Sequence, residues 1–430
     1  MKLLLLPMTA LARTFVDDAG ATHSSDKAAP TIVAQVGDAL SLEHMGLAHA
    51  QVIGTSGSNI NSDYADGNGG NAAAYGDHNA NPHDPTMFPT DPISTIEAAM
   101  LAQSADLTPS CSSTCFWCVG TVGEITRELD AHGWPDYILQ GAYGGKWPLI
   151  APFDPWLLGN ATARGVEVIT ILDSFNDATE TQSIPAGYIE ITKRYEELAA
   201  FLGGDADLSA DKRALCAEVN TFRATAAAAA ERGVRALGAY APWATVTGQD
   251  VAGWMSGPIE QVGFMLEELG MQILHVEGST EGGTDASTLG FSATAFPYPV
   301  DFWLYDVRVG LDFTSDAFAA AWPHPAVVAK QYAYWPNGGH IHSYEHGKEI
   351  LQLVGEALGK ANPVNDATPC TEVADIMDVD YRVNGIAAGE YACPQPVEYD
   401  WCPAYLSSDS AFLAGPGVLL AALAAVAALF

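Results

Sequence analysis

Basic residues are scarce in this sequence. Its 430 residues include 18 Lys and Arg against 52 Asp and Glu, which gives a formal net charge of −34 at pH 7. A surface with this excess of acid repels polyanions, so the sequence argues against nucleic-acid binding. Charged residues of both signs make up only 16% of the chain, and apolar residues make up 48%. This balance excludes a globally disordered chain and indicates a folded body with a sizeable core.

The signatures of several common enzyme classes are also missing. The chain has no G-x-S-x-G nucleophile elbow, no P-loop, no G-x-G-x-x-G after an expected strand and no H-E-x-x-H motif. Their absence favours a binding protein over an enzyme, and we expect no intrinsic cofactor.

Long apolar runs are confined to the two ends of the chain. Between the ends, no segment reaches the about 20 apolar residues that a membrane-spanning helix needs. At the N-terminus, Met1-Lys2 is followed by a short apolar region and an A-x-A pattern at Ala10 and Ala12. Residues 1–12 therefore predict a secretory signal peptide cleaved after Ala12, and a frayed apolar terminus or a misassigned start codon is the alternative.

The C-terminal segment has the order of a glycosylphosphatidylinositol (GPI) attachment signal. Small residues from Ser407 to Ala411 precede a short spacer and the apolar run from Gly417 to Phe430. Residues 411–430 therefore predict a GPI signal, with a membrane-spanning tail as the alternative. The expected location is the extracellular face of the plasma membrane or the lumen of the endomembrane system, with the protein held by a lipid anchor.

The cysteines fit an oxidising compartment. There are seven, an odd number, so at least one has no disulfide partner in the chain: Cys111, Cys115, Cys118, Cys216, Cys370, Cys393 and Cys402. The group Cys111, Cys115 and Cys118 has no second Cys or His pair at zinc-site spacing, so local disulfides are favoured over a metal knuckle. Asn160 begins a glycosylation sequon, which is compatible with export.

Short apolar strands alternate with helices along the chain. This order is typical of parallel sheets covered by helices, so the sequence predicts an α/β fold with two Rossmann-like lobes. Residues 13–29, which precede the first expected strand, are polar and are expected to be irregular. The expected strands are 31–36, 50–54, 135–139, 166–172, 234–240, 272–276, 302–305 and 331–335. The expected helices include 39–45, 188–202, 209–232, 258–269 and 343–358.

The longest expected helix, at residues 209–232, divides the pattern into two parts. At about 1.5 Å per residue it would be about 35 Å long, enough to cross between two lobes as a rigid strut. The N-terminal lobe is expected at 30–208, with a Gly- and Asn-rich insertion at 55–92, and the C-terminal lobe at 233–360. Residues 361–410 contain three cysteines and form an extension tied by disulfides.

Several short motifs follow this order of elements. Met45-Gly46-Leu47 ends the first helix, and Val52-Ile53-Gly54 forms the next strand. Further along come Pro135-Asp136-Tyr137-Ile138-Leu139, the run from Gly253 through Gly257-Pro258-Ile259, and Asp301-Phe302-Trp303-Leu304-Tyr305-Asp306. In this order, over residues 30–360, the motifs resemble those of the periplasmic-type substrate-binding proteins for iron siderophores and cobalamin.

The resemblance implies two lobes joined by one long helix, with a ligand held in the cleft between them. A ferric siderophore is the implied ligand, and a membrane reductase or transporter is the implied recipient. The acidic residue that family members often use to dock a membrane permease is Leu40 in this chain, which leaves that docking in doubt. The insertion, the extension and the apolar tail make the chain most similar to the eukaryotic surface siderophore-binding proteins of algae.

The candidate ligand-binding residues follow the expected strands. In open parallel sheets, ligands bind beyond the carboxyl ends of the strands, where aromatic faces suit a bulky organic shell. By this rule we select Tyr143, Trp147 and Asp173 in the first lobe and Trp243, Trp254, Met255, Tyr305, Asp306 and Arg308 in the second. Tryptophan in such a lobe is more often part of the core than a ligand platform. Arg308 would bind anionic oxygens of the ligand, and an ion pair with Asp306 is the alternative.

A histidine cluster after the last expected strand suggests a second kind of site. His342 and His346 are one helical turn apart, and with His340 they form a candidate metal site. Solvated imidazoles at a polar helix start are the alternative. Three functions therefore stay open: siderophore capture, direct binding of a metal ion (iron, zinc or manganese) or of cobalamin, and metal-dependent hydrolysis at the histidines.

Overall fold

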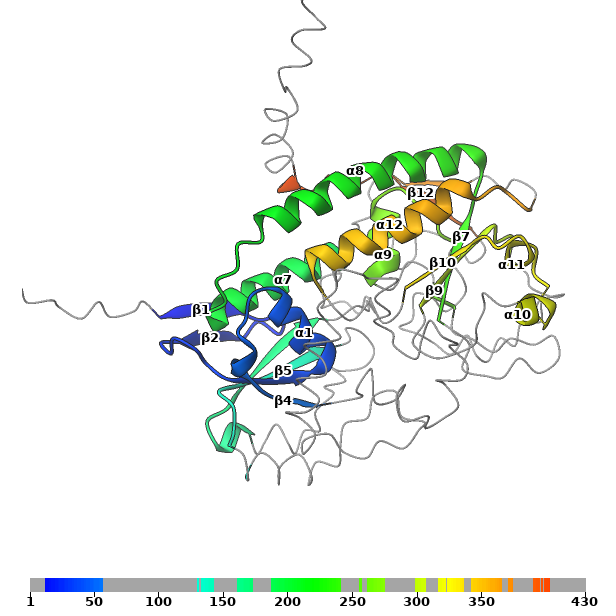
Figure 1. Ribbon diagram of the computed structural model, residues 1–430. Helices are drawn as coiled ribbons and strands as arrows, with labels where there is room; N and C mark the ends of the chain where they lie inside the picture. The colour runs from blue at the N-terminus through cyan, green and yellow to red at the C-terminus, as the bar shows by residue number, and fades with distance from the viewer. Residues whose placement is uncertain are drawn as a thin grey trace, which may run out of the picture.

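The computed structural model contains two four-stranded sheets and a layer of long helices (Figure 1). It describes residues 12–56, 130, 133–142, 161–172, 187–240, 255–256, 261–274, 298–306, 316–321, 323–335, 342–365, 370–373, 390–394, 396 and 398–402. The predicted C-terminal tail and nearly all of the predicted insertion lie outside these residues.

The first sheet is parallel throughout and has the order β4-β3-β5-β6. Its strands are β3 (Ile32–Gln35), β4 (Val52–Ser56), β5 (Tyr137–Ala142) and β6 (Glu167–Leu172). Ile32, Ile138 and Ile169 are completely buried, as expected for strands enclosed on both faces. Helix α1 (Val36–His44) follows β3 directly, and the 3-10 helix η1 (His49–Gln51) leads into β4.

A β-hairpin precedes the first sheet, so the expectation that residues 13–29 are irregular is wrong. Strand β1 (Arg13–Val16) pairs antiparallel with β2 (Thr22–Ser25). The carboxylate of Asp17 closes the turn by accepting a hydrogen bond from the backbone N–H of Ala21 at 2.7 Å. The hairpin buries Phe15 against the ring of Phe201, with centroids 5.8 Å apart. A single large apolar side chain gives too weak a periodic signal to predict a hairpin.

The second sheet has the order β10-β9-β7-β8 and is parallel except for β8. Its strands are β7 (Ala236–Tyr240), β8 (Met255–Ser256), β9 (Phe302–Asp306) and β10 (Tyr332–Trp335). Helices α9 (Gln261–Glu268), α10 (Asp316–Ala321) and α11 (Pro325–Val328) belong to the same half of the chain. The strand expected at 272–276 is reduced, in the described residues, to isolated bridges at Ile273 and Leu274.

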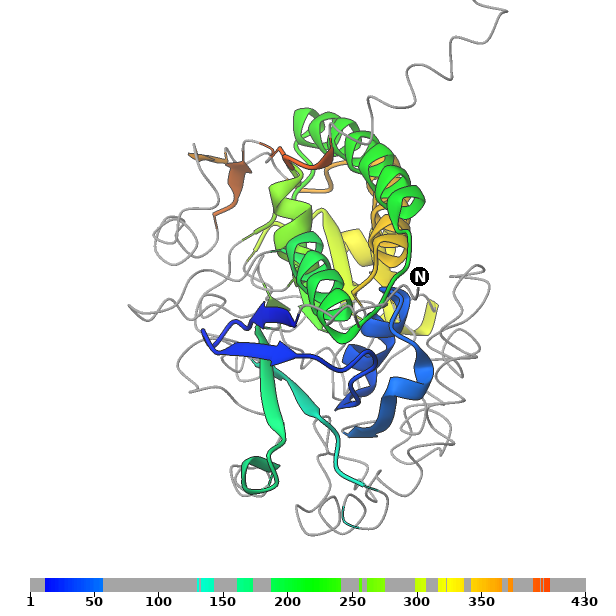
Figure 2. The same cartoon turned by 90° about the vertical axis from the view of Figure 1, so that its left-hand side faces the viewer.

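Three long helices form a layer beside the sheets: α7 (Tyr188–Leu202), α8 (Ser209–Arg232) and α12 (Tyr344–Lys360). Helices α8 and α12 pack side by side along one edge of the molecule (Figures 1 and 2). Gly355 permits this approach, because a Cβ there would lie 3.3 Å from the ring of Phe222. Helix α8 follows the first sheet and precedes the second in the chain. Its role as a rigid strut stays a prediction.

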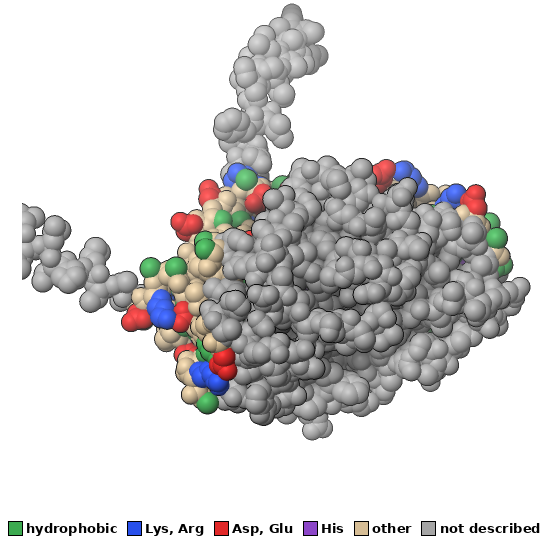
Figure 3. Space-filling view, turned by 60° about the horizontal axis from the view of Figure 1, so that its bottom comes forward, with side chains coloured by type: hydrophobic (Ala, Val, Ile, Leu, Met, Phe, Trp, Pro, Cys, Tyr) green, Lys and Arg blue, Asp and Glu red, His purple; other side chains and the backbone are tan. Residues whose placement is uncertain are grey.

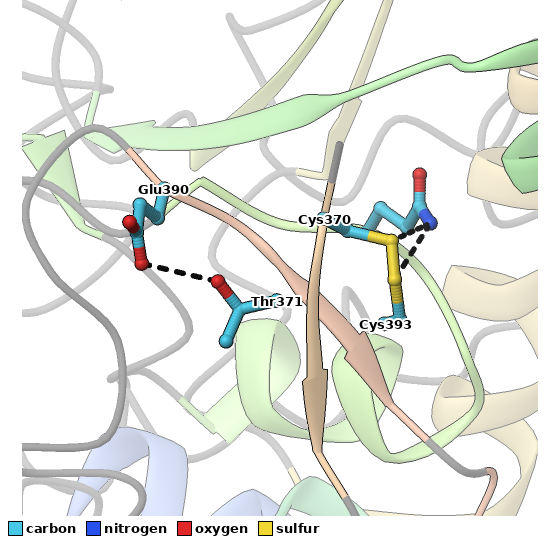
Figure 4. Close-up of a disulfide and its surroundings, with 5 residues drawn as sticks. Cys370, Thr371, Glu390 and Cys393 are labelled. Carbon is cyan, nitrogen blue, oxygen red and sulfur yellow. Dashed lines mark hydrogen bonds between the residues drawn. A yellow bond between two sulfur atoms is a disulfide. The ribbon is translucent and has the colours of Figure 1, made fainter. Parts of the chain in front are cut away.

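Two disulfides fasten the C-terminal extension, one within the extension itself and one to helix α8. Strands β11 (Thr371–Val373) and β12 (Ala392–Pro394) pair in parallel beside the Cys370–Cys393 disulfide (Figure 4). The side-chain amide of Gln272 lies 3.3 Å from the Cys370 sulfur, and the hydroxyl of Thr371 donates to Glu390. The second disulfide joins Cys402 to Cys216 of α8. The prediction of disulfides is confirmed for these four cysteines.

Alternating strands and helices and two mostly parallel sheets confirm the predicted α/β class. The predicted limits of the lobes stay predictions. Within the described ranges, none of the helices combines the length and the apolar character needed to cross a membrane.

Candidate functional site

Residues from different strands meet at the carboxyl end of the second sheet. Ala239 of β7 pairs with Met255 of β8 on one side and with Tyr305 of β9 on the other. Tyr305 in turn pairs with Tyr334 of β10. One row across the sheet therefore contains Tyr334, Tyr305, Ala239 and Met255. The register brings together two of the residues selected from the sequence, Met255 and Tyr305.

The next row of the same sheet consists of the last residues of three neighbouring strands. Asp306 of β9 pairs with Tyr240 of β7 and with Trp335 of β10. The selection from the sequence included Tyr305, at the end of the expected strand 302–305. It omitted Tyr240, Tyr334 and Trp335, which occupy the same kind of position in the expected strands 234–240 and 331–335. The rule that ligands bind beyond the carboxyl ends would have found them if it had been applied to the last two residues of every strand.

The first sheet offers a matching edge. Strands β5 and β6 stay in register to their last residues, so that Ala142 pairs with Leu172. The candidates Tyr143 and Asp173 come immediately after this pair. Their shared position follows from the register, whereas their side chains lie outside the described residues. The remaining candidates outside the described residues are Trp147, Trp243, Trp254, Arg308 and His340.

A buried ion pair fixes the opposite, amino end of the second sheet. The Nε atom of Arg235, just before β7, donates to Oδ2 of Asp301, just before β9, at 2.7 Å, and neither side chain is exposed. The other carboxylate oxygen, Oδ1, accepts from the backbone N–H groups of Val364 and Asn365, at 2.8 and 3.0 Å. The carboxylate is thus enclosed by donors, as a buried charge requires. This network holds β7 and β9 in the register that aligns Tyr240 with Asp306.

A neutral histidine packs against β9. The ring nitrogen Nδ1 of His324 accepts from Trp303 Nε1 and from the backbone N–H of Ala326, both at 3.2 Å. Burial lowers the pKa of His324 from 6.5 to about 4, against an opposing effect of Asp301. The imidazole is therefore uncharged at neutral pH, which suits its two roles as N-cap of α11 and acceptor for the buried Trp303.

The two described histidines of the predicted cluster, His342 and His346, lie at the start of α12 in the helical layer. His342 is completely buried, and its ring stacks on Tyr195 of α7 with centroids 4.9 Å apart and an angle of 10°. Its backbone N–H donates to the hydroxyl of Ser41 in α1 at 2.8 Å. His346 is also buried, and its backbone N–H donates to the capping hydroxyl of Ser343 at 3.0 Å. These contacts join the start of α12 to helices of the first half of the chain.

A metal role for the cluster stays a prediction. Among the described residues there is no group of three His, Cys, Asp or Glu side chains placed to hold a metal ion. The third predicted ligand, His340, lies outside those residues.

Comparisons with known proteins find similarity among solved structures. No protein-family model matches the sequence, and no curated protein matches it. Among solved structures, DesE, a ferric-siderophore receptor protein from Streptomyces coelicolor, matches with a TM-score of 0.55 at 20% identity. The match covers 82% of this chain and 100% of DesE.

Two further solved structures are similar at lower scores. The iron uptake ABC transporter substrate-binding protein PiuA from Streptococcus pneumoniae matches 81% of this chain and 97% of its own, at 14% identity and a TM-score of 0.45. The siderophore binding protein FhuD from Vibrio cholerae, bound to Fe3+-Desferal, matches 77% of this chain and 98% of its own, at 16% identity and a TM-score of 0.43. The match to DesE shows that this chain has the fold of a ferric-siderophore receptor protein.

Proposed function

We propose that this protein captures a ferric siderophore at the carboxyl ends of its two sheets and releases it unchanged. One observation carries the proposal: the register of the second sheet sets Tyr334, Tyr305 and Met255 in one row, at the edge where parallel sheets bind ligands. The shared fold with a ferric-siderophore receptor supports the same ligand class.

The residue types at both edges suit such a ligand. A siderophore surrounds iron with an organic shell that apolar and aromatic side chains can cover, while its outer oxygens accept hydrogen bonds. In this proposal Tyr143, Trp147, Trp243 and Trp254 would add aromatic surface for the ligand, and Asp173 and Asp306 would add polar groups. In this proposal Arg308 supplies the positive charge that binds the anionic oxygens of the ligand.

An ion pair between Arg308 and Asp306 is the alternative for that charge. Most described cations in this chain lie beside acids: examples are Arg194 with Asp18 at 2.9 Å and Lys360 with Glu356 at 2.7 Å. Acidic and basic side chains accordingly lie next to one another at the edges of the face in Figure 3. A ligand titration of an Arg308 variant separates the two roles.

Direct capture of a metal ion or of cobalamin is the second candidate, and a metal-dependent hydrolase is the third. The hypotheses of metal-ion capture and of metal-dependent hydrolysis both depend on the histidine cluster. His342 stacks on the ring of Tyr195 and lies 5.0 Å from the tilted ring of Tyr188, which favours a packing role for that imidazole. We therefore propose a binding protein without a catalytic step.

We further propose that the protein is exported and lipid-anchored, and that it passes the iron complex to a membrane reductase or transporter. The signal-like residues 1–12 and the small and apolar residues of the C-terminal tail support this location. Phosphatidylinositol-specific phospholipase should release the protein from intact cells. Retention under conditions that release a known GPI-anchored protein would favour a spanning tail.

The binding proposal is tested by titrating tryptophan fluorescence with ferric siderophores, their iron-free forms, cobalamin, haem and divalent metals. We expect saturation at one ferric siderophore per chain and weaker binding of the iron-free form. Tight binding of zinc alone would overturn the proposal in favour of metal capture. Turnover of an ester or amide substrate that a chelator abolishes would favour the hydrolase.

A further inference from the structure

The last described residues, 398–402, contact helices α8, α9 and α12. We call this segment the strap. Cys402 forms a disulfide with Cys216 of α8, with the two Cα atoms 5.4 Å apart and a sequence separation of 186. Both cysteines are buried. The strap, at the red end of the colour scale, lies beside α8 (Figure 2). It is therefore covalently fastened to the longest helix of the layer.

Tyr399 connects the strap to α9. Its hydroxyl donates to Oε2 of Glu268 at 3.1 Å, and both side chains are buried. Burial and then the charge of Glu268 raise the pKa of Tyr399 well above its usual value, so the hydroxyl remains a donor. Next to it, Glu398 pairs with Arg223 of α8 at 3.1 Å. These contacts fix the strap between α8 and α9.

Trp401 connects the strap to α12. Its ring meets that of Tyr344 edge to face, with centroids 5.8 Å apart. The hydroxyl of Tyr344 in turn donates to Glu196 of α7. Lys212 of α8 lies over the Tyr344 ring at 5.1 Å. Through this one tyrosine, the strap, α8, α12 and α7 share a contact.

Helix α7 is the element that the two halves of the chain share. It packs against α1 and β1 of the first half and against α9 and α12 of the second. At its amino end, a Cβ added to Gly187 would lie 2.6 Å from Oε2 of Glu268, the atom that accepts from Tyr399. The strap thus meets α9 and α12 at the points where these helices contact α7.

We infer that the strap is a covalent clamp on the contact between the two halves. By holding α8, α9 and α12 together against α7, it sets how far the carboxyl ends of the two sheets lie from each other. Only the consequence for ligand affinity rests on the proposed function. The effect on the helices stands without it.

Hydrogen–deuterium exchange of the purified full chain tests the clamp. In the double variant Cys216→Ser/Cys402→Ser, amides at the amino ends of α7 and α12 and at the carboxyl end of α9 should exchange about tenfold faster. Amides of the first sheet should be unchanged. The matched control Cys370→Ser/Cys393→Ser removes the other disulfide and should leave all three helix ends as in the wild type.

A milder variant keeps the test decisive if the double variant does not fold. Tyr399→Phe retains the ring and removes only its bond to Glu268, so exchange should rise at the facing ends of α7 and α9, by about threefold to tenfold. Unchanged exchange there, or equal acceleration in the Cys370→Ser/Cys393→Ser control, would overturn the clamp.

Ligand affinity gives the second measurement. The titration with a ferric siderophore should show about fivefold weaker binding in Cys216→Ser/Cys402→Ser, chiefly through faster release. Equal affinity together with accelerated exchange would show that the strap does not set the site, and would overturn its role in positioning. If the wild type binds no ferric siderophore, the proposed function fails, and the exchange measurement still decides the clamp.

Discussion

Arg235 and Asp301 form an ion pair that is completely enclosed by the protein, with Nε and Oδ2 2.7 Å apart. The pair joins the starts of β7 and β9. Asp301 also accepts hydrogen bonds from the backbone N–H groups of Val364 and Asn365. It therefore fixes both the register of the second sheet and the origin of the C-terminal extension.

Removing one partner of this pair should destabilise the protein strongly. Asp301→Ala leaves the Arg235 charge buried without its counter-ion and should lower the free energy of unfolding by about 3–5 kcal/mol. Asp316→Ala, which breaks the exposed pair with Lys330, is the matched control and should cost less than about 1 kcal/mol. Chemical denaturation of both variants measures the difference. Equal effects would contradict the structural role of the buried pair.

His324 should make stability depend on pH. Its pKa is about 4 in the folded protein against 6.5 for an ordinary histidine, so below pH 6.5 only the unfolded chain takes up this proton. The stabilising contribution is complete above about pH 6.5, and about 3 kcal/mol of it is lost as the pH falls towards 4.

His324→Gln keeps an acceptor for Trp303 and removes the titration. The difference in unfolding free energy between pH 7.5 and pH 4.5 should therefore be smaller in this variant than in the wild type, by about 2–3 kcal/mol. Urea unfolding at the two pH values measures it. An identical pH dependence in both proteins would show that His324 is not buried as a neutral group.

The fold was largely predictable from the sequence, because its long elements have strong local signals. The bounds of α7 and α8 agree with the expected 188–202 and 209–232, since each helix ends at a glycine in the left-handed region, Gly203 (φ 98°) and Gly233 (φ 81°). The hairpin of β1 and β2 was missed, because its stability comes from Phe15 and Asp17 contacts with distant residues.

The candidate site was predictable in position but incomplete in membership. Strand order predicted that Met255 and Tyr305 belong to one edge, whereas the pairing of Tyr305 with Tyr334 depends on a register that no local pattern encodes. The strap was not predictable, because seven cysteines allow many pairings and Cys216 and Cys402 are 186 residues apart.

The row at the carboxyl edge should contribute to ligand affinity. Tyr305→Ala should weaken binding of a ferric siderophore about tenfold, since it removes an aromatic surface worth about 1–1.5 kcal/mol. Tyr332→Ala, at the amino end of β10, is the matched control and should change affinity less than about twofold. Fluorescence titration compares them. Equal losses would place the ligand elsewhere.

Replacing Arg308 should reduce ligand affinity more than replacing the histidines. Arg308→Ala removes charge-assisted bonds to the anionic edge of the ligand and should cost about 1.5–3 kcal/mol of binding free energy. His340→Ala should cost much less. Replacing His340, His342 and His346 together should also cost less, after correction for the packing that buried His342 and His346 supply. Normal binding by Arg308→Ala and none by the histidine variants would favour direct metal capture.

The most direct test of the account is native mass spectrometry of the full chain mixed with a ferric hydroxamate siderophore. We expect a mass increase equal to one intact iron–siderophore complex per chain, and recovery of the same complex after the protein is denatured. Retention of iron without the organic ligand, or recovery of a cleaved siderophore, would contradict capture without transformation.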